Sequence, residues 1–223
     1  MWLGDCVYVF PDEVKRVLGK LHASFSDGTQ QDAQELLLFF LNVLHNDLKR
    51  SSQTENFLSL SLPMPPDNRC SIQDCLRLFF KEEVLSSRDQ PFCSFCGRKQ
   101  DQAESIQLLK APDIIIIHLK RFESNDHGNR KLTSTVTFPL EDLDLSQYTT
   151  NPSMQQLKYH LYAVVNHTGT LDSGHYTAYC KNPVTQNWHE FNDAKVTSIS
   201  EQKIQSPAAY VLFYNCVNFQ WPQ

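Results

Sequence analysis

The chain has 223 residues, of which 41% are hydrophobic and 20% are charged, and its formal net charge is -5. This length and mixed composition suit one large domain with a buried core. The weakly acidic balance argues against a nucleic-acid groove, and no apolar run approaches the roughly 20 residues of a membrane span, so we expect neither nucleic acid nor a membrane as a partner.

The start of the chain and its cysteines indicate a compartment. Residues 1–5 (MWLGD) lack the basic start and apolar stretch of a signal peptide. The cysteines number seven, an odd count, and their spacing is unlike that of a small secreted disulfide scaffold. We therefore expect a reducing compartment, the cytoplasm or the nucleus.

The first 50 residues read as helical. Apolar residues recur at helical spacing over residues 11–22. Thr29 precedes Asp32 by three positions, as in a capping box, and opens a longer helix over residues 30–49. Apolar residues cover most of the circumference of this second helix, which predicts a central place in a helical lobe.

The rest of the chain becomes rich in strands. Residues 57–62 alternate between apolar and polar, residues 71–80 begin as a capped helix, and the β-branched run at 113–119 predicts a strand buried on both faces. Two segments, 124–130 and 149–156, read as exposed loops. From residue 159 onward we expect five strands, at 159–166, 175–181, 188–192, 195–197 and 210–214. The order predicts an α+β fold with an antiparallel sheet.

A histidine and an Asn-Asp pair stand out in these strands. His175 lies in the aromatic segment 174–179 (GHYTAY), and Asn192 and Asp193 end the segment 188–193 (WHEFND). A catalytic imidazole needs a polar acceptor at its second nitrogen, which either residue of the pair can supply. A histidine in an aromatic strand is more often structural, however, and Asn-Asp is also typical of a turn. The residues alone leave both interpretations open.

Two further polar groups have a structural and a functional interpretation. Cys93 and Cys96 form a CxxC pair, which is half of a tetrahedral zinc site, but two cysteines in a tight turn without metal are at least as consistent with it. Asp32 and Glu35 lie in the polar segment 30–35 (QQDAQE). They either complement a helix N-terminus or face a cleft and bind a basic peptide.

Taken together, these segments resemble the ubiquitin-specific protease family of deubiquitinases. The matching pieces occur in the family's order over nearly the whole chain: 30–36, 58–63, 93–96, 118–122, 162–169, 174–179, 188–193 and 209–214. The resemblance implies a papain-like cysteine peptidase fold of the α+β class, with a helical thumb lobe, an antiparallel β palm and fingers. It also implies that the partner is ubiquitin or a ubiquitinated protein.

The resemblance assigns roles residue by residue. His175 is the general base, Asn192 orients it, and Asp193 assists. Asp32 and Glu35 hold the arginines of the ubiquitin tail. Catalysis requires no cofactor. Cys93 and Cys96 would be half of the structural zinc site of the fingers.

Two departures from the family pattern concern the nucleophile and the fingers. The family's cysteine lies in a Gly-Asn-Thr-Cys-Tyr box well upstream of the segment 30–35, and nothing here matches that box. Cys6 lacks the Asn-Thr pair and lies too close to Asp32. Between Arg50 and Phe57, where the family has the first half of the fingers and a second CxxC, there are only six residues. The zinc site therefore lacks two ligands.

The expected organisation is one incomplete protease domain over residues 1–223. It comprises a helical thumb remnant (1–50), shortened fingers with a connecting helix (51–110) and the palm (111–223). By resemblance the function is deubiquitination, the thiol-dependent hydrolysis of ubiquitin C-terminal peptide and isopeptide bonds. The chain alone is predicted inactive because it lacks the nucleophile; the alternative is a catalytically dead ubiquitin-binding or scaffold module. We also expect residues 36–48 to expose apolar surface, since the helical lobe lacks a covering segment.

Overall fold

A large sheet organises the protein. The computed structural model describes residues 11–26, 28–48, 57–65, 69–86, 89–110, 112–125, 128–152 and 158–219. The sheet strands are β1 (Phe57–Leu62), β7 (Ile114–Leu119), β11 (Leu143–Asp144), β12 (Lys158–Gly169), β13 (Gly174–Lys181), β14 (Trp188–Asn192), β15 (Lys195–Ile199) and β16 (Ala209–Cys216). Their spatial order is β1-β7-β16-β12-β13-β14-β15, with β11 paired to β12. The five strands expected after residue 159 are confirmed.

One pairing differs from the expected antiparallel sheet. β1 runs parallel to β7, with Leu58 opposite Ile115 and Leu60 opposite Ile117, whereas the other pairs are antiparallel. Parallel neighbours require a long crossover connection, and the chain between β1 and β7 supplies one. The sheet is therefore mixed, and the α+β class of the prediction holds.

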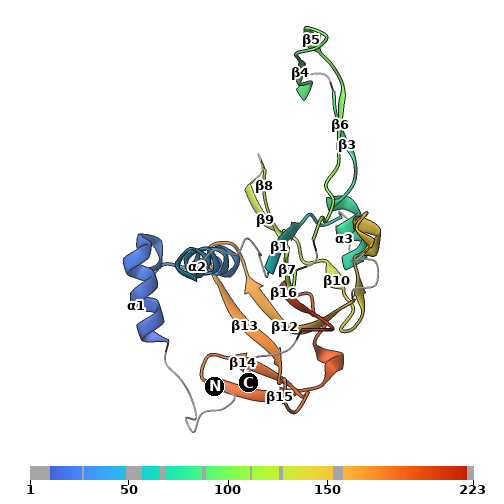
Figure 1. The fold of residues 1–223 in the computed structure, drawn as a ribbon. Helices are drawn as coiled ribbons and strands as arrows, with labels where there is room; N and C mark the ends of the chain where they lie inside the picture. Colours follow the sequence, from blue (N-terminus) through green and yellow to red (C-terminus); the bar gives the residue numbers. More distant parts are fainter. Residues whose placement is uncertain are drawn as a thin grey trace.

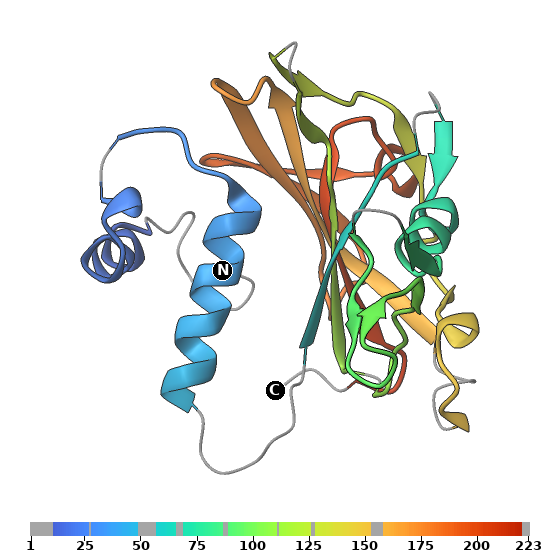
Figure 2. The same ribbon diagram turned by 90° about the horizontal axis from the view of Figure 1, so that it is seen from above.

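Helices lie on both faces of the sheet (Figure 2). The helix α1 (Asp12–Leu21) and the longer α2 (Ala33–Leu48) lie to one side, and α3 (Ile72–Phe79) lies on the other. The described residues also form short 3-10 helices: η1 (Ala23–Phe25), η3 (Ser146–Tyr148) and η5 (Glu201–Lys203). In the part of the chain that the structure describes, no helix has both the length and the apolar character needed to cross a bilayer.

The sheet separates two apolar clusters. On the α3 side, Ile115 and Ile117 of β7 belong to the main core together with Ile72 and Leu76 of α3. On the α2 side, the intervening Ile116 belongs to a smaller cluster with residues of α2 and β16. Successive side chains of a strand point to opposite faces, so this division explains why β7 reads as a continuous apolar run.

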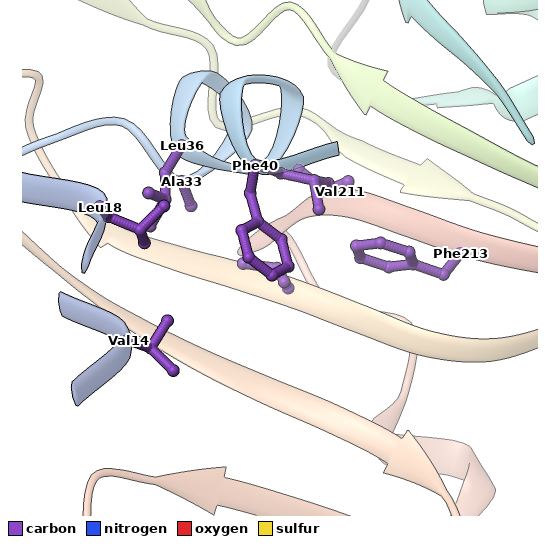
Figure 3. A pocket seen from close by; sticks show the side chains of 9 residues that line it. Val14, Leu18, Ala33, Leu36, Phe40, Val211 and Phe213 are labelled. Carbon is purple, nitrogen blue, oxygen red and sulfur yellow. The ribbon is translucent and has the colours of Figure 1, made fainter. Parts of the chain in front are cut away.

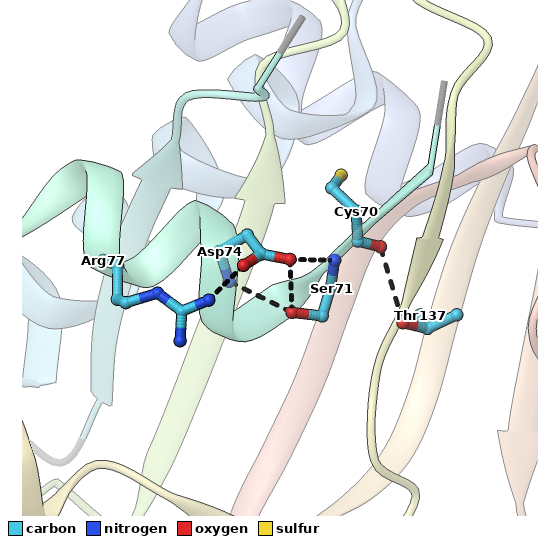
Figure 4. Close-up of polar contacts among 5 residues, drawn as sticks. All are labelled: Cys70, Ser71, Asp74, Arg77 and Thr137. Carbon is cyan, nitrogen blue, oxygen red and sulfur yellow. Dashed lines mark hydrogen bonds and ion pairs between the residues drawn. The ribbon is translucent and has the colours of Figure 1, made fainter. Parts of the chain in front are cut away.

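The start of α3 is fixed by a capping box, as its sequence predicts. The Ser71 hydroxyl accepts the Asp74 backbone N–H, and the Asp74 carboxylate accepts the Ser71 N–H (Figure 4). Hydrogen bonds from Ser71 lower the pKa of Asp74. The preceding strand β2 (Arg69–Ser71) pairs in parallel with β10 (Thr135–Thr137), so the cap also anchors this small sheet.

The helix α2 lies between α1 and the sheet (Figure 2), but it is less buried than its apolar circumference indicates. None of its residues between 33 and 44 is buried, because only one face of the helix rests on the sheet. Phe40 and Leu44 remain more than a third exposed. The exposed apolar surface expected for this helix is therefore present in its described side chains.

Two-stranded ribbons extend the body in the described residues. β3 (Glu83–Leu85) pairs with β6 (Gln102–Glu104) in a ribbon that projects away from the sheet, and β4 (Phe92–Cys93) pairs with β5 (Arg98–Lys99) at its tip (Figure 1). β8 (Phe122–Asn125) pairs with β9 (Gly128–Lys131). The loop predicted over 124–130 is thus largely a hairpin, whose polar strand residues concealed it.

Candidate active site

His175 and Asn192 meet across neighbouring strands. β13 and β14 pair antiparallel, with Ala178 opposite Phe191, so the start of one strand lies beside the end of the other. His175 Nε2 lies 2.8 Å from Asn192 Oδ1. The structure therefore brings together the two residues that the sequence analysis selected as base and orienting partner.

The contact selects one tautomer of the imidazole. An amide oxygen only accepts hydrogen bonds, so Nε2 of His175 carries the proton and donates it to Asn192 Oδ1. Nδ1 then holds a lone pair and is available as a base. The His175 side chain is about half exposed, so a substrate can reach it from solvent.

The Asn-Asp pair forms a turn and also lies beside the imidazole of His175. Asp193 has a left-handed backbone with φ of 50°, and it turns the chain between β14 and β15, where Asn192 faces Lys195. Its Oδ2 lies 3.9 Å from His175 Nε2, and its side chain is largely exposed. Asp193 therefore forms the turn that positions Asn192 and stands close enough to stabilise a protonated His175 electrostatically.

Asp32 caps the N-terminus of α2 and connects this helix to the sheet. Its Oδ1 accepts the backbone N–H groups of Gln34 and Glu35, so Asp32, and not Thr29 as the sequence suggested, is the N-cap of α2. Its Oδ2 accepts the Tyr210 hydroxyl of β16. Glu35 lies one turn further on with an exposed side chain.

Two more contacts hold the start of α2 beside the start of β13. The Gln30 side-chain oxygen accepts the Gly174 N–H at 3.3 Å, and the Tyr176 hydroxyl accepts the Ala33 N–H at 3.3 Å. Gly174 and Tyr176 flank His175 in sequence. The structure therefore places the segment that carries Asp32 and Glu35 next to the strand that carries the imidazole.

Sequence reasoning assigned no role to Lys131 and His167; His167 lies on β12, opposite Tyr176 of β13. Lys131 Nζ lies 2.9 Å from His167 Nδ1 and donates to the His167 carbonyl at 2.7 Å. Burial, and then the charge of Lys131, lower the pKa of His167, and burial lowers that of Lys131. A Cβ on Gly174 would lie 2.1 Å from His167 Nε2, so the ring requires a glycine there.

The CxxC pair lies away from this site, at the tip of the projecting ribbon (Figure 1). Cys93 Sγ and Cys96 Sγ are 3.5 Å apart. Within the described residues, no group of three or more His, Cys, Asp or Glu side chains gathers closely enough to hold a metal ion. The pair thus offers two zinc ligands and not a complete set. Cys6 lies outside the described residues.

An apolar cavity separates the helices from the sheet on the α2 side. It has a volume of about 290 Å³ and is lined from α1, α2, β12 and β16 (Figure 3). Phe40, Val211 and Phe213 line it, whereas His175 and Asn192 do not. The cavity therefore belongs to the incompletely packed α2 interface, separate from the polar site.

Comparison with known proteins identifies the family. The family model described as ubiquitin carboxyl-terminal hydrolase matches residues 5–214. The chain belongs to this family. The resemblance seen in the sequence motifs is therefore confirmed, together with the papain-like α+β fold that the family implies.

Curated relatives in this hydrolase family cover most of the chain. Ubiquitin carboxyl-terminal hydrolase 2 of Gallus gallus is 34% identical over 264 residues, covering 92% of this chain and 74% of the relative. The Homo sapiens protein of the same name is 33% identical, covering 92% of this chain and 44% of the relative. For Usp2 of Drosophila melanogaster the chain spans 29% of the relative. The chain thus spans less than half the length of several relatives that it matches.

The alignment with the Gallus gallus relative also bears on internal segments. It runs over 264 positions, more than the 223 residues of this chain, so the relative contains stretches without counterpart here.

Solved structures support the fold. A chain in the SAGA DUB module bound to monoubiquitin has a TM-score of 0.80 at 28% identity, covering 94% of this chain and 53% of that one. The module bound to ubiquitin aldehyde gives 0.74 at 26% identity, covering 93% and 54%.

Proposed function

We propose that this chain forms the ubiquitin-recognising and base-supplying part of a thiol-dependent deubiquitinase, which hydrolyses peptide and isopeptide bonds at the C-terminus of ubiquitin. The observation that carries the proposal is the 2.8 Å contact between His175 Nε2 and Asn192 Oδ1. It fixes the imidazole in the tautomer that a cysteine peptidase requires. The structural neighbours bound to ubiquitin and ubiquitin aldehyde support ubiquitin as the partner.

The geometry supports a separate role for each of His175, Asn192 and Asp193 in the reaction. Nδ1 of His175 takes the proton of an attacking thiol and later gives it to the leaving amine. Asn192 holds the ring throughout, because its oxygen accepts the Nε2 proton in both charge states. While the imidazole is protonated, the Asp193 carboxylate at 3.9 Å adds favourable charge. None of these steps uses a cofactor.

The chain by itself is proposed to lack the nucleophile. No segment matches the family's Gly-Asn-Thr-Cys-Tyr box, and Cys6 has neither the sequence context nor the spacing of that box. Among the described cysteines, Cys93 and Cys96 are at the ribbon tip, and burial raises the pKa of Cys75 to about 12 and that of Cys180 to about 11. A thiol with a raised pKa is a poor nucleophile at neutral pH. The chain alone should therefore be inactive.

The second candidate function is a catalytically dead ubiquitin-binding or scaffold module. It is favoured by the anchored start of α2, where Asp32 is fixed and Glu35 is exposed, in a chain without the nucleophile box. Oδ2 of Asp32 retains acceptor capacity beyond its bond to Tyr210, whereas Oδ1 already accepts two backbone N–H groups. The two acidic residues can thus bind the arginines of the ubiquitin tail without catalysis.

Titration of ubiquitin against the purified chain tests the binding role. Glu35→Arg is the variant of choice, because Asp32 also caps α2 and its replacement would disturb the fold. Glu201→Arg, at an exposed position on η5, is the matched control for the charge change. We expect weak binding that Glu35→Arg reduces at least about tenfold, a loss of roughly 1.4 kcal/mol.

The same titration with ubiquitin lacking its C-terminal tail completes the test. Two results together would support recognition of the tail by the start of α2. Ubiquitin without its tail should not bind the native chain, and intact ubiquitin should still bind the Glu201→Arg variant. If Glu35→Arg and Glu201→Arg bind equally to intact ubiquitin, the proposed role of this acidic segment is wrong.

A further inference from the structure

The tip of the projecting ribbon holds two thiols in a tight turn. Between β4 and β5 the segment 93–97 (CSFCG) reverses the chain: the Gly97 N–H donates to the Cys93 carbonyl at 2.9 Å, and Gly97 has φ of +67°. Cys93 pairs with Arg98 in the short ladder. This turn brings the sulfur atoms of Cys93 and Cys96 to 3.5 Å from each other.

The turn meets the backbone requirement of a disulfide bond. A disulfide joins residues whose Cα atoms lie about 4.4–6.8 Å apart, and residues three positions apart in a tight turn are separated by less than about 7 Å. The bond is about 2.05 Å long, so side-chain rotation is enough to close the gap between the two sulfurs. Gln90 Nε2 donates to Asp101 Oδ1 at 2.8 Å across the base of the tip, which holds its two arms together.

The tip also contains the most accessible thiol in the described part of the chain. Cys96 is the one exposed cysteine there, Cys93 beside it is half-buried, and Phe95 between them is 97% exposed. The cysteines buried in the body are Cys70, Cys75 and Cys216. A reagent in solution therefore reaches Cys96 first, with Cys93 next to it as a second thiol.

The ligand set at the tip differs from the zinc site that the family resemblance implies. A closed structural zinc site takes four protein ligands. Among the described residues, no third His, Cys, Asp or Glu side chain gathers with Cys93 and Cys96. The ribbon also holds the tip away from β13 and β14 (Figure 1). Two adjacent thiols are by themselves a complete set for a different reaction, which is thiol–disulfide exchange.

We propose that Cys93 and Cys96 form a reversible dithiol–disulfide redox site, whose co-reactant is a low-molecular-weight disulfide such as glutathione disulfide. The Cys96 thiolate attacks one sulfur of the co-reactant, so a mixed disulfide forms, the S–S bond of the co-reactant breaks and one thiolate leaves. The Cys93 thiolate then attacks the Cys96 sulfur and releases the second thiolate. The two cysteine thiols are oxidised, the co-reactant is reduced to two thiols, and the two cysteine protons pass to them.

The second displacement is favoured by the geometry of the turn. Both thiols belong to one short segment that is already folded before oxidation, so Cys93 reacts within the same chain. A mixed disulfide at Cys96 should therefore be short-lived, and the internal disulfide should be the stable product. The site goes beyond the proposed deubiquitination, because the tip lies apart from His175 and Asn192 (Figure 1).

Intact mass spectrometry of the full chain tests the proposal. The chain is reduced, freed of metal with a chelator and incubated with excess glutathione disulfide. We expect a mass loss of about 2 Da, the two thiol hydrogens, with no glutathione retained. Peptide mapping should place the disulfide between Cys93 and Cys96, and reduced glutathione in excess should restore both thiols.

Single variants separate the two steps of the exchange. In Cys93→Ser the glutathione on Cys96 has no neighbouring thiol to displace it, so this adduct should persist at least about tenfold longer than in the native chain. Cys180→Ser, on β13, should behave as the native chain; circular dichroism checks that each variant is folded.

Four outcomes would overturn the proposal. They are two free tip thiols after treatment, glutathione that stays on the native tip, a disulfide that maps to another pair of cysteines, and a disulfide that joins two chains. None of these outcomes depends on whether the chain binds ubiquitin, so the test is separate from that of the proposed function.

Discussion

The Tyr210 hydroxyl donates to Asp32 Oδ2 at 2.5 Å, joining residues 178 positions apart in the sequence. Tyr210 belongs to β16 in the sheet, and Asp32 begins α2. Burial, followed by the hydrogen bond to Asp32, raises the pKa of Tyr210, so the phenol stays protonated and remains a donor at any ordinary pH. This bond ties the helical part of the protein to the sheet beside His175.

Loss of that bond should weaken the attachment of α2. Tyr210→Phe removes a hydrogen bond to a charged group, and we expect the free energy of unfolding to fall by about 1–3 kcal/mol. Chemical denaturation measures the change. Tyr179→Phe, a half-buried tyrosine on β13, is the matched control and should change stability by less than about 1 kcal/mol. Equal losses of unfolding free energy in the two variants would show that the hydrogen bond to Asp32 adds no measurable stability.

The stability of the fold should depend on pH through His118. Burial lowers the pKa of His118 to about 4, below the ordinary value of 6.5. On lowering the pH, His118 of the unfolded chain therefore binds a proton near pH 6.5, whereas His118 of the folded chain binds it only near pH 4. Stability from this group is complete above pH 6.5 and falls as the pH drops from 6.5 to 4, by about 3 kcal/mol in total.

A variant isolates this contribution from other acid effects. His118→Gln keeps a polar group near Ser61, the partner of the ring in the native fold, but removes the titration. Denaturant unfolding between pH 7 and pH 4 should show a steeper loss of stability for the native chain than for His118→Gln. Lowered pKa values of His167 and Asp144 act in both proteins and cancel in the difference. Parallel pH profiles would contradict the prediction.

Gly174 should tolerate no side chain. Its added Cβ would lie 2.1 Å from His167 Nε2 and 2.7 Å from the Thr168 carbonyl oxygen, and Lys131 restrains the histidine ring. Gly174→Ala should therefore lower the free energy of unfolding by about 1–3 kcal/mol, the usual cost of overpacking. Gly28→Ala, where a Cβ meets nothing within 4 Å, is the control and should lie within about 1 kcal/mol of the native value.

The exposed side of α2 should promote self-association. Phe40 and Leu44 are 36% and 37% exposed on neighbouring turns, beside the incompletely filled cavity. Phe40→Glu with Leu44→Glu should raise solubility and shift sedimentation toward monomer. Val184→Glu changes an isolated exposed residue and should leave association unaltered. A native chain that is already monomeric under these conditions would contradict this prediction.

Local patterns in the sequence predicted much of this architecture. The spacing of apolar residues indicated α1, and Ser71 with Asp74 indicated the start of α3. The proximity of His175 and Asn192 was also predictable, because two short strands joined by a brief connection pair as a hairpin, which fixes their ends side by side. These features depend on residues close in sequence.

Contacts between distant segments were not predictable from such patterns. The parallel pairing of β1 with β7 depends on tertiary packing, and so does the link between Lys131 and His167 across 36 positions. The hairpin of β8 and β9 has polar strand residues and a glycine, which look like a loop until the paired backbone is seen. The partial exposure of α2 was not predictable for a related reason: an apolar circumference indicates burial but does not show which partner covers each face.

The central claim, a base and its orienting amide assembled in a chain without its nucleophile, is tested most directly with ubiquitin that carries a C-terminal electrophile. The native chain is incubated with this reagent and analysed by intact mass. The account predicts no covalent adduct, although His175 and Asn192 are in contact. An adduct that maps to Cys6 and disappears in Cys6→Ala would contradict it, because the chain would then hold a working nucleophile.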